Sequence, residues 1–507
     1  MQPCRCILGL QSRTRRMSSC LSQHSPYACT SLLSQTTLTL TRPRMYVTGG
    51  RSGLRVVAGE GRSANRTRWS AKDMSAQQSN LIAPKTPSDE GYAAELVWQA
   101  SQDLQPTFAG IDQLVGQNLR RVQAAMQRHR IGPHHFSGST GYGHGDLGRE
   151  AYDEVLADVL GAEAALGRVQ FVSGTHAIAT ALYALLRPGD ELLAVAGRPY
   201  DTMEEVIGLR GTQGHGSLLE WGVTYQELPL AEQGLMTGMP CVQPSPHVSI
   251  ETKVALIQRS CGYASRPTLD LAEIDMAVQV IKSQQPDCLV VVDNCYGEFT
   301  DTKEPCAVGA DLCMGSLIKN PGGTIVTGGG YVAGKAHLVR AAQARLTAPG
   351  VGMDAGCVPG DTVRLMMQGL FLAPQMVGEA LKGGRLLAQV MSQAGYPCTP
   401  MQGLPTPHSF ITAVHLGSSA KMTAFCRAVQ RCCPIGSYIQ PIPGITPGYK
   451  DEVIFADGTF IDGSTSELSA DGPIRPPYTV YCQGGTHWTH WAFALESALE
   501  AIQTVHD

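Results

Sequence analysis

One lysine stands out by its position in the chain. Lys319 lies in "MGSLIKNPGGTIVTGG", between a small apolar run and a glycine-rich turn, and not on a surface helix, where lysines are common. A lysine shielded from water loses proton affinity and becomes a nucleophile that can form an imine with an aldehyde. Ser316, three residues earlier, could contact a bound anion.

A second loop, "SGTHA", joins a short apolar strand to an apolar helix that is expected to begin at about Thr175. The free N–H groups and the positive dipole end of such a helix attract an anion such as phosphate, and Gly174 lets the anion approach the backbone. We therefore take Gly174, Thr175 and His176 as candidate phosphate-binding residues. Turns of this kind also occur without any ligand.

Two more loops complete the set. Tyr200 directly follows the apolar run 191–196, so its ring could stack on a flat ligand or simply pack within the loop. Asp293 ends the apolar strand "CLVVVD", where a carboxylate is costly unless it is paired. Its partner could be a backbone donor, a neighbouring arginine or the protonated nitrogen of a pyridine ring.

A phosphate cradle, a stacking ring, an acid for a ring nitrogen and a lysine for an aldehyde are the parts that a pyridoxal 5′-phosphate site requires. Their order along the chain, each at a strand end, favours this combined interpretation over four unrelated loops. The sequence therefore predicts a cofactor-bearing Lys319, with Asp293 and Tyr200 as catalytic and cofactor-binding residues and Ser316 as a second phosphate contact.

The elements that must position these loops alternate between strand and helix. A short strand is expected in "RVQFV" before "SGTHA", others at 191–196, "VTYQELPL", "VALIQRS" and "CLVVVD", and a strand pair or bend in "GGTIVTGGGYVAG". Apolar strands that alternate with helices predict a mostly parallel sheet covered on both faces, in which ligands bind at the carboxyl ends of the strands.

The pattern changes beyond about Gly360. A long helical stretch that is expected to bend at Pro374 is followed by "SFITAVHLG", "AKMTAFCRAVQRCC", "TVYCQGG" and a final helix. We interpret this as a smaller α+β domain. The predicted division is a transit peptide in 1–72, a helical arm in 73–130, a large cofactor-binding domain in 131–355 and a small C-terminal domain in 356–507.

The first 72 residues hold twelve Arg and Lys against one acid, Glu60, with many Ser and Thr. This composition is typical of an organellar transit peptide, although a disordered tail is the alternative. We expect a chloroplast in preference to a mitochondrion. Removing this +11 segment from a chain of net charge −4 leaves −15, which argues against a nucleic-acid partner. No apolar run reaches the ~18 residues needed to span a bilayer.

Other motifs are weaker. "GYGHGDLG" contains G-x-G-x-x-G, but no strand precedes it, so it does not indicate a dinucleotide site. "SLIK" lacks the S-D-N and K-T-G partners of penicillin-binding enzymes. Twelve of the sixteen Cys lie beyond Cys29 without a C-x-x-C pair, which favours buried, reduced thiols, and no His/Cys spacing predicts a metal.

Several longer stretches carry a family resemblance. "GSTGYGHGDLGREAYDEVLADVLGAEAALGRVQFVSGTHAIATAL", "RPYDTMEEVIG", "VVVDNCYGEF" and "IRPPYTVYCQGG" resemble the methionine γ-lyase-like proteins that are often labelled aluminium-resistance proteins. The resemblance covers the chain from about residue 85 to its end. It implies fold-type-I architecture, as in aspartate aminotransferase, and carbon–sulfur lyase chemistry with pyridoxal phosphate on an amino acid, expected to be a sulfur amino acid.

The resemblance also implies an assembly. Related lyases form homodimers or dimers of dimers, in which a tyrosine of one subunit reaches the phosphate of the other, and Tyr142 matches it by position. The arginine that accompanies that tyrosine has no clear counterpart, because Arg149 lies too far along the chain. Arg475 is the candidate for holding the substrate carboxylate, although it could be a surface arginine. Other pyridoxal phosphate chemistry (aminotransferase, aldolase or racemase) and a stress protein of low activity are the alternative functions.

Overall fold

The structure is a computed structural model, and it describes residues 91–228, 248–264, 266–400 and 410–505. The predicted transit peptide in 1–72 lies outside the described residues. Among the helices within these ranges, none is both long and apolar enough to cross a membrane.

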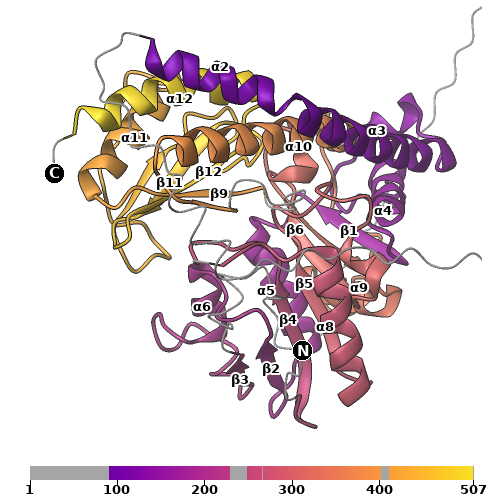
Figure 1. Ribbon diagram of the computed structural model, residues 1–507. Helices are drawn as coiled ribbons and strands as arrows, with labels where there is room; N and C mark the ends of the chain where they lie inside the picture. The colour runs from indigo at the N-terminus through magenta and orange to yellow at the C-terminus, as the bar shows by residue number, and fades with distance from the viewer. Residues whose placement is uncertain (1–90, 229–247, 265, 401–409, 506–507) are drawn as a thin grey trace, which may run out of the picture. The chain divides into compact units, whose positions relative to one another are not determined.

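A seven-stranded sheet forms the first half of the described chain (Figure 1). Its strands β6, β5, β4, β2 and β3 run parallel, whereas β7 is antiparallel to both of its neighbours, β1 and β6. The predicted mostly parallel sheet is thus confirmed. In spatial order the strands are β1 (Ala164–Arg168), β7 (Gly330–Gly334), β6 (Leu312–Ser316), β5 (Leu289–Asp293), β4 (Thr252–Gln258), β2 (Glu191–Ala194) and β3 (Thr224–Glu227).

Both faces of this sheet are buried, as the side chains of β5 show. Successive side chains of a strand point to opposite faces, and those of β5 lie in two different cores. Val291 lies in the apolar core that includes α5 (Gly174–Leu185) and α9 (Ala336–Leu346). Val290 and Val292 lie in the core that includes α4 (Leu147–Leu160) and α8 (Leu271–Gln284). Fully apolar strands such as β5 are the consequence of this double cover. The short helix α6 (Asp201–Ile207) follows β2.

A second, antiparallel sheet has five strands and its own core. Helix α12 packs against α2, α10 and α11, and α10 also packs against α3 (Figure 1). The strands are β10 (Val453–Ala456), β11 (Ser469–Pro473), β12 (Thr479–Gln483), β9 (Thr412–His415) and β8 (Cys398–Thr399). The helices are α2 (Tyr92–Asp103), α3 (Gln105–Arg128), α10 (Thr362–Gln393), α11 (Ser419–Cys432) and α12 (Trp488–Gln503).

Two details differ from the sequence-based prediction. The first strand is 164–168, "AALGR", and not "RVQFV", because pairing with β7 selects the earlier segment. "GGTIVTGGGYVAG" forms no strand pair: a 3₁₀ turn at Asn320–Gly322 leads to the single strand β7. Helix α10 is assigned as one helix through Pro374. The predicted division into four segments stays a prediction.

Candidate active site

The carboxyl ends of three neighbouring parallel strands meet at the predicted site. Gln258 at the end of β4 lies directly opposite Asp293 at the end of β5, and Ser316 ends β6. The loop after β2 joins them, because the backbone N–H of Tyr200 donates to Oε1 of Gln258 at 2.7 Å. Three strand ends and the loop after β2 thus lie at one edge of the sheet, as sequence reasoning predicted for Asp293, Ser316 and Tyr200. Gln258 was not predicted.

The N-terminus of α5 reaches the same edge. Ser173 is the N-cap residue and accepts a hydrogen bond from the backbone N–H of His176 at 3.1 Å. A Cβ added to Gly174 would lie 3.0 Å from Cβ of Ser316, so glycine allows helix and strand end to approach. Oγ1 of Thr175 lies 2.8 Å from the hydroxyl of Tyr200. The predicted phosphate-binding residues therefore lie together, with amide and hydroxyl donors of the kind that hold phosphate.

Lys319 is fixed by the residues that follow it. Asn320 donates to the backbone oxygen of Glu298 at 3.0 Å and accepts from the hydroxyl of Thr465 at 2.8 Å, so the segment is held from two sides. A Cβ on Gly322 would lie 2.1 Å from the backbone oxygen of Leu317. Only glycine fits there, which explains the glycine-rich turn after the lysine.

The ammonium group of Lys319 lies against an aromatic ring. Its Nζ donates a hydrogen bond to the hydroxyl of Tyr296 at 2.9 Å and lies 4.1 Å from the centroid of that ring. Burial lowers the pKa of Lys319, but Tyr296, Cys295 and Tyr449 outweigh burial, so the pKa is above its ordinary value. The sequence suggested that shielding from water lowers the proton affinity of Lys319. This expectation is wrong for the unmodified lysine, because the sequence alone does not reveal the neighbours that raise its pKa.

Asp293 is buried beside this lysine. Its Oδ1 accepts the backbone N–H of Cys295 at 3.1 Å. Burial raises the pKa of Asp293, while hydrogen bonds from Cys295 and the charges of Lys319 and Arg266 lower it. The charge of Asp293 in turn contributes to the raised pKa of Tyr200, after burial. Of the partners that the sequence left open, a backbone donor is thus present, and the carboxylate lies close to both Lys319 and Tyr200.

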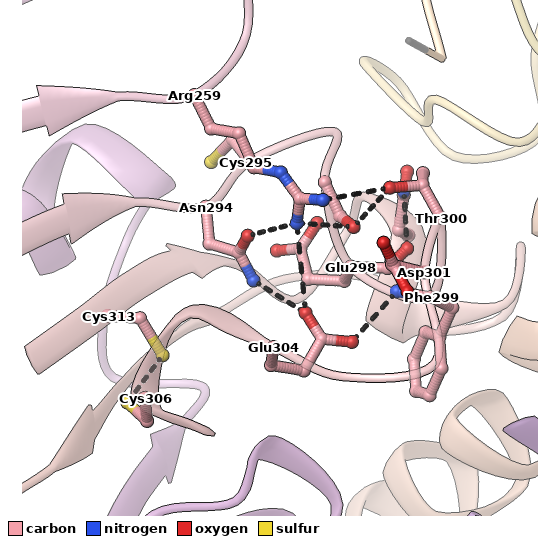
Figure 2. A network of polar contacts seen from close by, with 12 residues as sticks. Arg259, Asn294, Cys295, Glu298, Phe299, Thr300, Asp301, Glu304, Cys306 and Cys313 are labelled. Atoms are coloured by element: carbon pink, nitrogen blue, oxygen red, sulfur yellow. Dashed lines mark hydrogen bonds and ion pairs between the residues drawn. The ribbon is translucent and has the colours of Figure 1, made fainter. Parts of the chain in front are cut away.

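A buried polar network supports the loop that follows Asp293 (Figure 2). Arg259, which follows β4, donates to Oδ1 of Asn294 at 2.9 Å and to the backbone oxygen of Gly297 at 2.8 Å. Asn294 donates to Glu304 at 3.0 Å, and Glu304 accepts the backbone N–H of Phe299 at 3.0 Å. Because Arg259 and Glu304 are both buried, the loop has little freedom to move.

Tyr142 and Arg475 lie at the surface. The Tyr142 ring is 80% exposed and stacks on His144 with centroids 5.5 Å apart, so within its own chain it projects into solvent. Arg475 pairs with Asp451 at 2.7 Å, and its side chain is 46% exposed. A substrate carboxylate would have to share this guanidinium with Asp451. The roles of both residues stay predictions.

Sequence reasoning missed the aromatic and acidic wall beside Lys319. This wall consists of Tyr296, Tyr263, Tyr449 and Asp471, which come from four separate stretches of the chain. Only Tyr296 carried a signal, since it lies three residues after Asp293.

A surface hollow of about 580 Å³ lies elsewhere. It is lined by residues such as Tyr183, Arg210 and Glu220 and shares no residue with the wall beside Lys319. Chemistry rather than cavity size therefore locates the candidate site. Within the described ranges, no cluster of three His, Cys, Asp or Glu is arranged to hold a metal.

Sheet, crossover helices and loop cluster together define a fold-type-I architecture of the aspartate aminotransferase kind, with a smaller C-terminal α+β part. A family model described as methionine gamma-lyase matches residues 93–503. The chain therefore belongs to the methionine γ-lyase family, as the resemblance predicted.

Individual relatives agree over most of their length. The chain is 42% identical to the uncharacterized protein YnbB of Bacillus subtilis over 412 residues, 80% of this chain and 97% of that protein. A Listeria monocytogenes structure, named a candidate cystathionine beta-lyase involved in aluminium resistance, is 41% identical with a TM-score of 0.76, covering 81% of this chain and all of that chain. A Clostridium novyi structure, named a carbon-sulfur lyase involved in aluminium resistance, is 38% identical with a TM-score of 0.75, covering 85% and 99%.

Proposed function

We propose that this protein binds pyridoxal 5′-phosphate at Lys319 and eliminates a sulfur-containing group from an amino acid. The observation that carries the proposal is the meeting of Lys319, Asp293, Tyr200 and the α5 N-terminus at one sheet edge. The names of the Listeria and Clostridium relatives support carbon–sulfur lyase chemistry in preference to another reaction of the same cofactor.

The described residues fit this cofactor. Gly174 lies so close to Ser316 that a Cβ at position 174 would crowd the space expected to hold the phosphate. Thr175 and Ser316 offer hydroxyl groups beside the first turn of α5. The first N–H groups of a helix have no acceptor within it and suit a phosphate. Lys319 would hold the aldehyde carbon, Asp293 the ring nitrogen and Tyr200 a face of the ring. When bound, pyridoxal phosphate supplies an electron sink for the α-carbon of an amino acid.

The residues of the chain then have distinct tasks. As a neutral amine, Lys319 would accept a proton at Nζ and return it as an ammonium group, within hydrogen-bond distance of the Tyr296 hydroxyl. Asp293 would keep a proton on the ring nitrogen, because its carboxylate is buried and held by the backbone N–H of Cys295. The network around Arg259 holds the loop between them in place. Because this carboxylate is already held in place, little free energy would be spent on reorganising it during the reaction.

The test is a screen of purified protein against sulfur amino acids, with release of 2-oxo acid and of thiol measured separately. Stoichiometric release of both supports carbon–sulfur elimination. Release of neither, with turnover of another amino acid by transamination, aldol cleavage or racemisation, would assign the cofactor site to that chemistry instead.

We also propose that residues 1–72 direct the chain to an organelle, a chloroplast in preference to a mitochondrion. Fusion of this segment to a fluorescent protein would test the proposal.

A further inference from the structure

A carboxylate surrounded by aromatic rings faces the candidate site from the second sheet. Asp471 is the middle residue of β11 and pairs with Phe455 on β10 and with Tyr481 on β12. The hydroxyl of Tyr263, which follows β4, donates a hydrogen bond to Oδ2 of Asp471. The Tyr263 ring lies 5.1 Å from the Tyr481 ring and 5.6 Å from the Tyr449 ring, centroid to centroid. These contacts connect the two sheets next to Lys319.

This cluster interacts with Lys319. The charge of Lys319 lowers the pKa values of both Asp471 and Tyr449 against the larger, opposite effect of burial. Asp471, Tyr263, Tyr449 and Lys319 are each half-buried as residues, within a packed cluster. A small polar ligand entering the site would therefore meet the carboxylate.

A carboxylate among aromatic rings is a site for a cation, because the ring faces are negative and the carboxylate supplies a full charge. In this structure the ammonium group of Lys319 supplies a positive charge nearby. If Lys319 holds the cofactor, its nitrogen would be taken up by that group and would no longer be a free ammonium donor. Arg475 is already paired with Asp451, and Asp457 adds a repulsive negative charge. The carboxylate of Asp471 is then left with a site suited to another cation.

We propose that Asp471, together with Tyr263 and Tyr449, binds a cationic group at the far end of the substrate side chain. The inference rests on the proposed function and deepens it. It names as preferred substrates amino-acid thioethers whose side chain ends in an ammonium group, in contrast to those that end in a methyl group or a carboxylate. Asp471 would select the substrate, whereas Lys319 would act at the α-carbon and Asp293 would hold the ring nitrogen.

Three probes of similar length separate these side-chain ends: S-(2-aminoethyl)-L-cysteine is cationic, S-propyl-L-cysteine neutral and S-(carboxymethyl)-L-cysteine anionic. Equilibrium binding to the cofactor-loaded protein is measured by calorimetry, and thiol release in parallel. We expect the cationic probe to bind about ten- to a hundredfold more tightly than the neutral one, as for a hydrogen bond to a charged group. The anionic probe should bind more weakly than the neutral one.

The variant Asp471→Asn keeps shape and removes charge, so it should reduce the preference for the cationic probe to about threefold or less. Asp457→Asn removes an exposed charge of the same sign that interacts with Asp471, and it should leave the preference nearly unchanged. Equal affinity for the three probes in the unmodified protein overturns the inference, and this arm requires no variant to fold. An unchanged preference in Asp471→Asn also overturns it.

The outcome is separable from the proposed function. A protein without covalent cofactor on Lys319 contradicts the proposed function. A loaded protein that binds or cleaves thioethers without preference for a terminal ammonium group contradicts the role of Asp471 alone.

Discussion

The ammonium group of Lys319 and the phenol of Tyr296 form one unit: Nζ donates to the hydroxyl oxygen at 2.9 Å and lies 4.1 Å from the ring centroid. Tyr296 adopts a φ of 69°, a left-handed conformation that is unfavourable for a bulky side chain. In this conformation the phenol lies beside the lysine. Tyr296 is therefore a positioning residue for the group that is proposed to carry the cofactor.

Tyr296→Phe should lower the pKa of Lys319 in the cofactor-free protein by about 1 to 2, because a hydrogen bond to a charged group is worth about 1.5–3 kcal/mol. Competitive acetylation across a pH series, read by mass spectrometry, reports this value. Exposed Lys335 in the same sample is the internal control and should not change. An unaltered titration of Lys319 would show that the phenol has no such influence.

Asp293→Asn should retain bound cofactor but reduce turnover by about ten- to a hundredfold, since one charge-assisted contact is lost. Cofactor content and steady-state rates on the best sulfur amino acid are the measurements. Asp287→Asn removes an exposed charge just before β5 and serves as the matched control. Full activity of Asp293→Asn would exclude the predicted role.

Arg259→Ala should lower the free energy of unfolding by about 3–5 kcal/mol, because it leaves the buried oxygens of Asn294 and Gly297 without their donor and removes a buried cation beside Glu304. Denaturant titration measures the change. The pair of exposed Arg128 and half-buried Asp158 offers a comparison, in which Arg128→Ala should cost less than about 1 kcal/mol. Similar costs for the two variants would contradict the supporting role of the network.

Burial raises the pKa of Glu298 to about 8, against an ordinary value of 4.5, and Tyr331 donates to its Oε1 at 2.7 Å. The folded protein thus binds a proton that the unfolded chain releases above pH 4.5, so this group costs stability as pH rises from about 4.5 to 8. Glu298→Gln, which stays neutral, should lose less stability across this window than the unmodified protein. Parallel losses in thermal unfolding at pH 5 and pH 8 would refute the raised pKa.

The predicted dimer with Tyr142 reaching the partner's phosphate pocket can be tested by complementation. Tyr142→Ala and Lys319→Ala chains are each expected to be nearly inactive alone. Co-expressed with two different tags and purified as a mixed dimer, they should regain activity, because one site then has both native side chains. A mixed dimer as inactive as its parents, or a fully active Tyr142→Ala protein, would contradict the shared site.

The sequence predicted the large sheet and the loop residues at its edge because apolar runs mark buried parallel strands, and the residues after them must lie at one edge. Lys319, Asp293 and Tyr200 were found in this way. Asp471 was not, because "SADGP" in β11 contains residues that are depleted in strands. Only pairing with β10 and β12 makes it a strand.

Tyr263 and Tyr449 were missed for a related reason. They lie in loops that meet only through tertiary contact, with ring centroids 5.6 Å apart. No local pattern encodes such a meeting. The raised pKa of Lys319 was missed as well, because it depends on Tyr296, Cys295 and Tyr449 and not on burial alone.

The most direct test of the central claim is borohydride reduction of the purified protein followed by peptide mapping. The account predicts one pyridoxyl adduct, on Lys319 in the peptide that contains "SLIKNPGG", and its disappearance in Lys319→Ala. An adduct on another lysine, or none after incubation with pyridoxal phosphate, would contradict it.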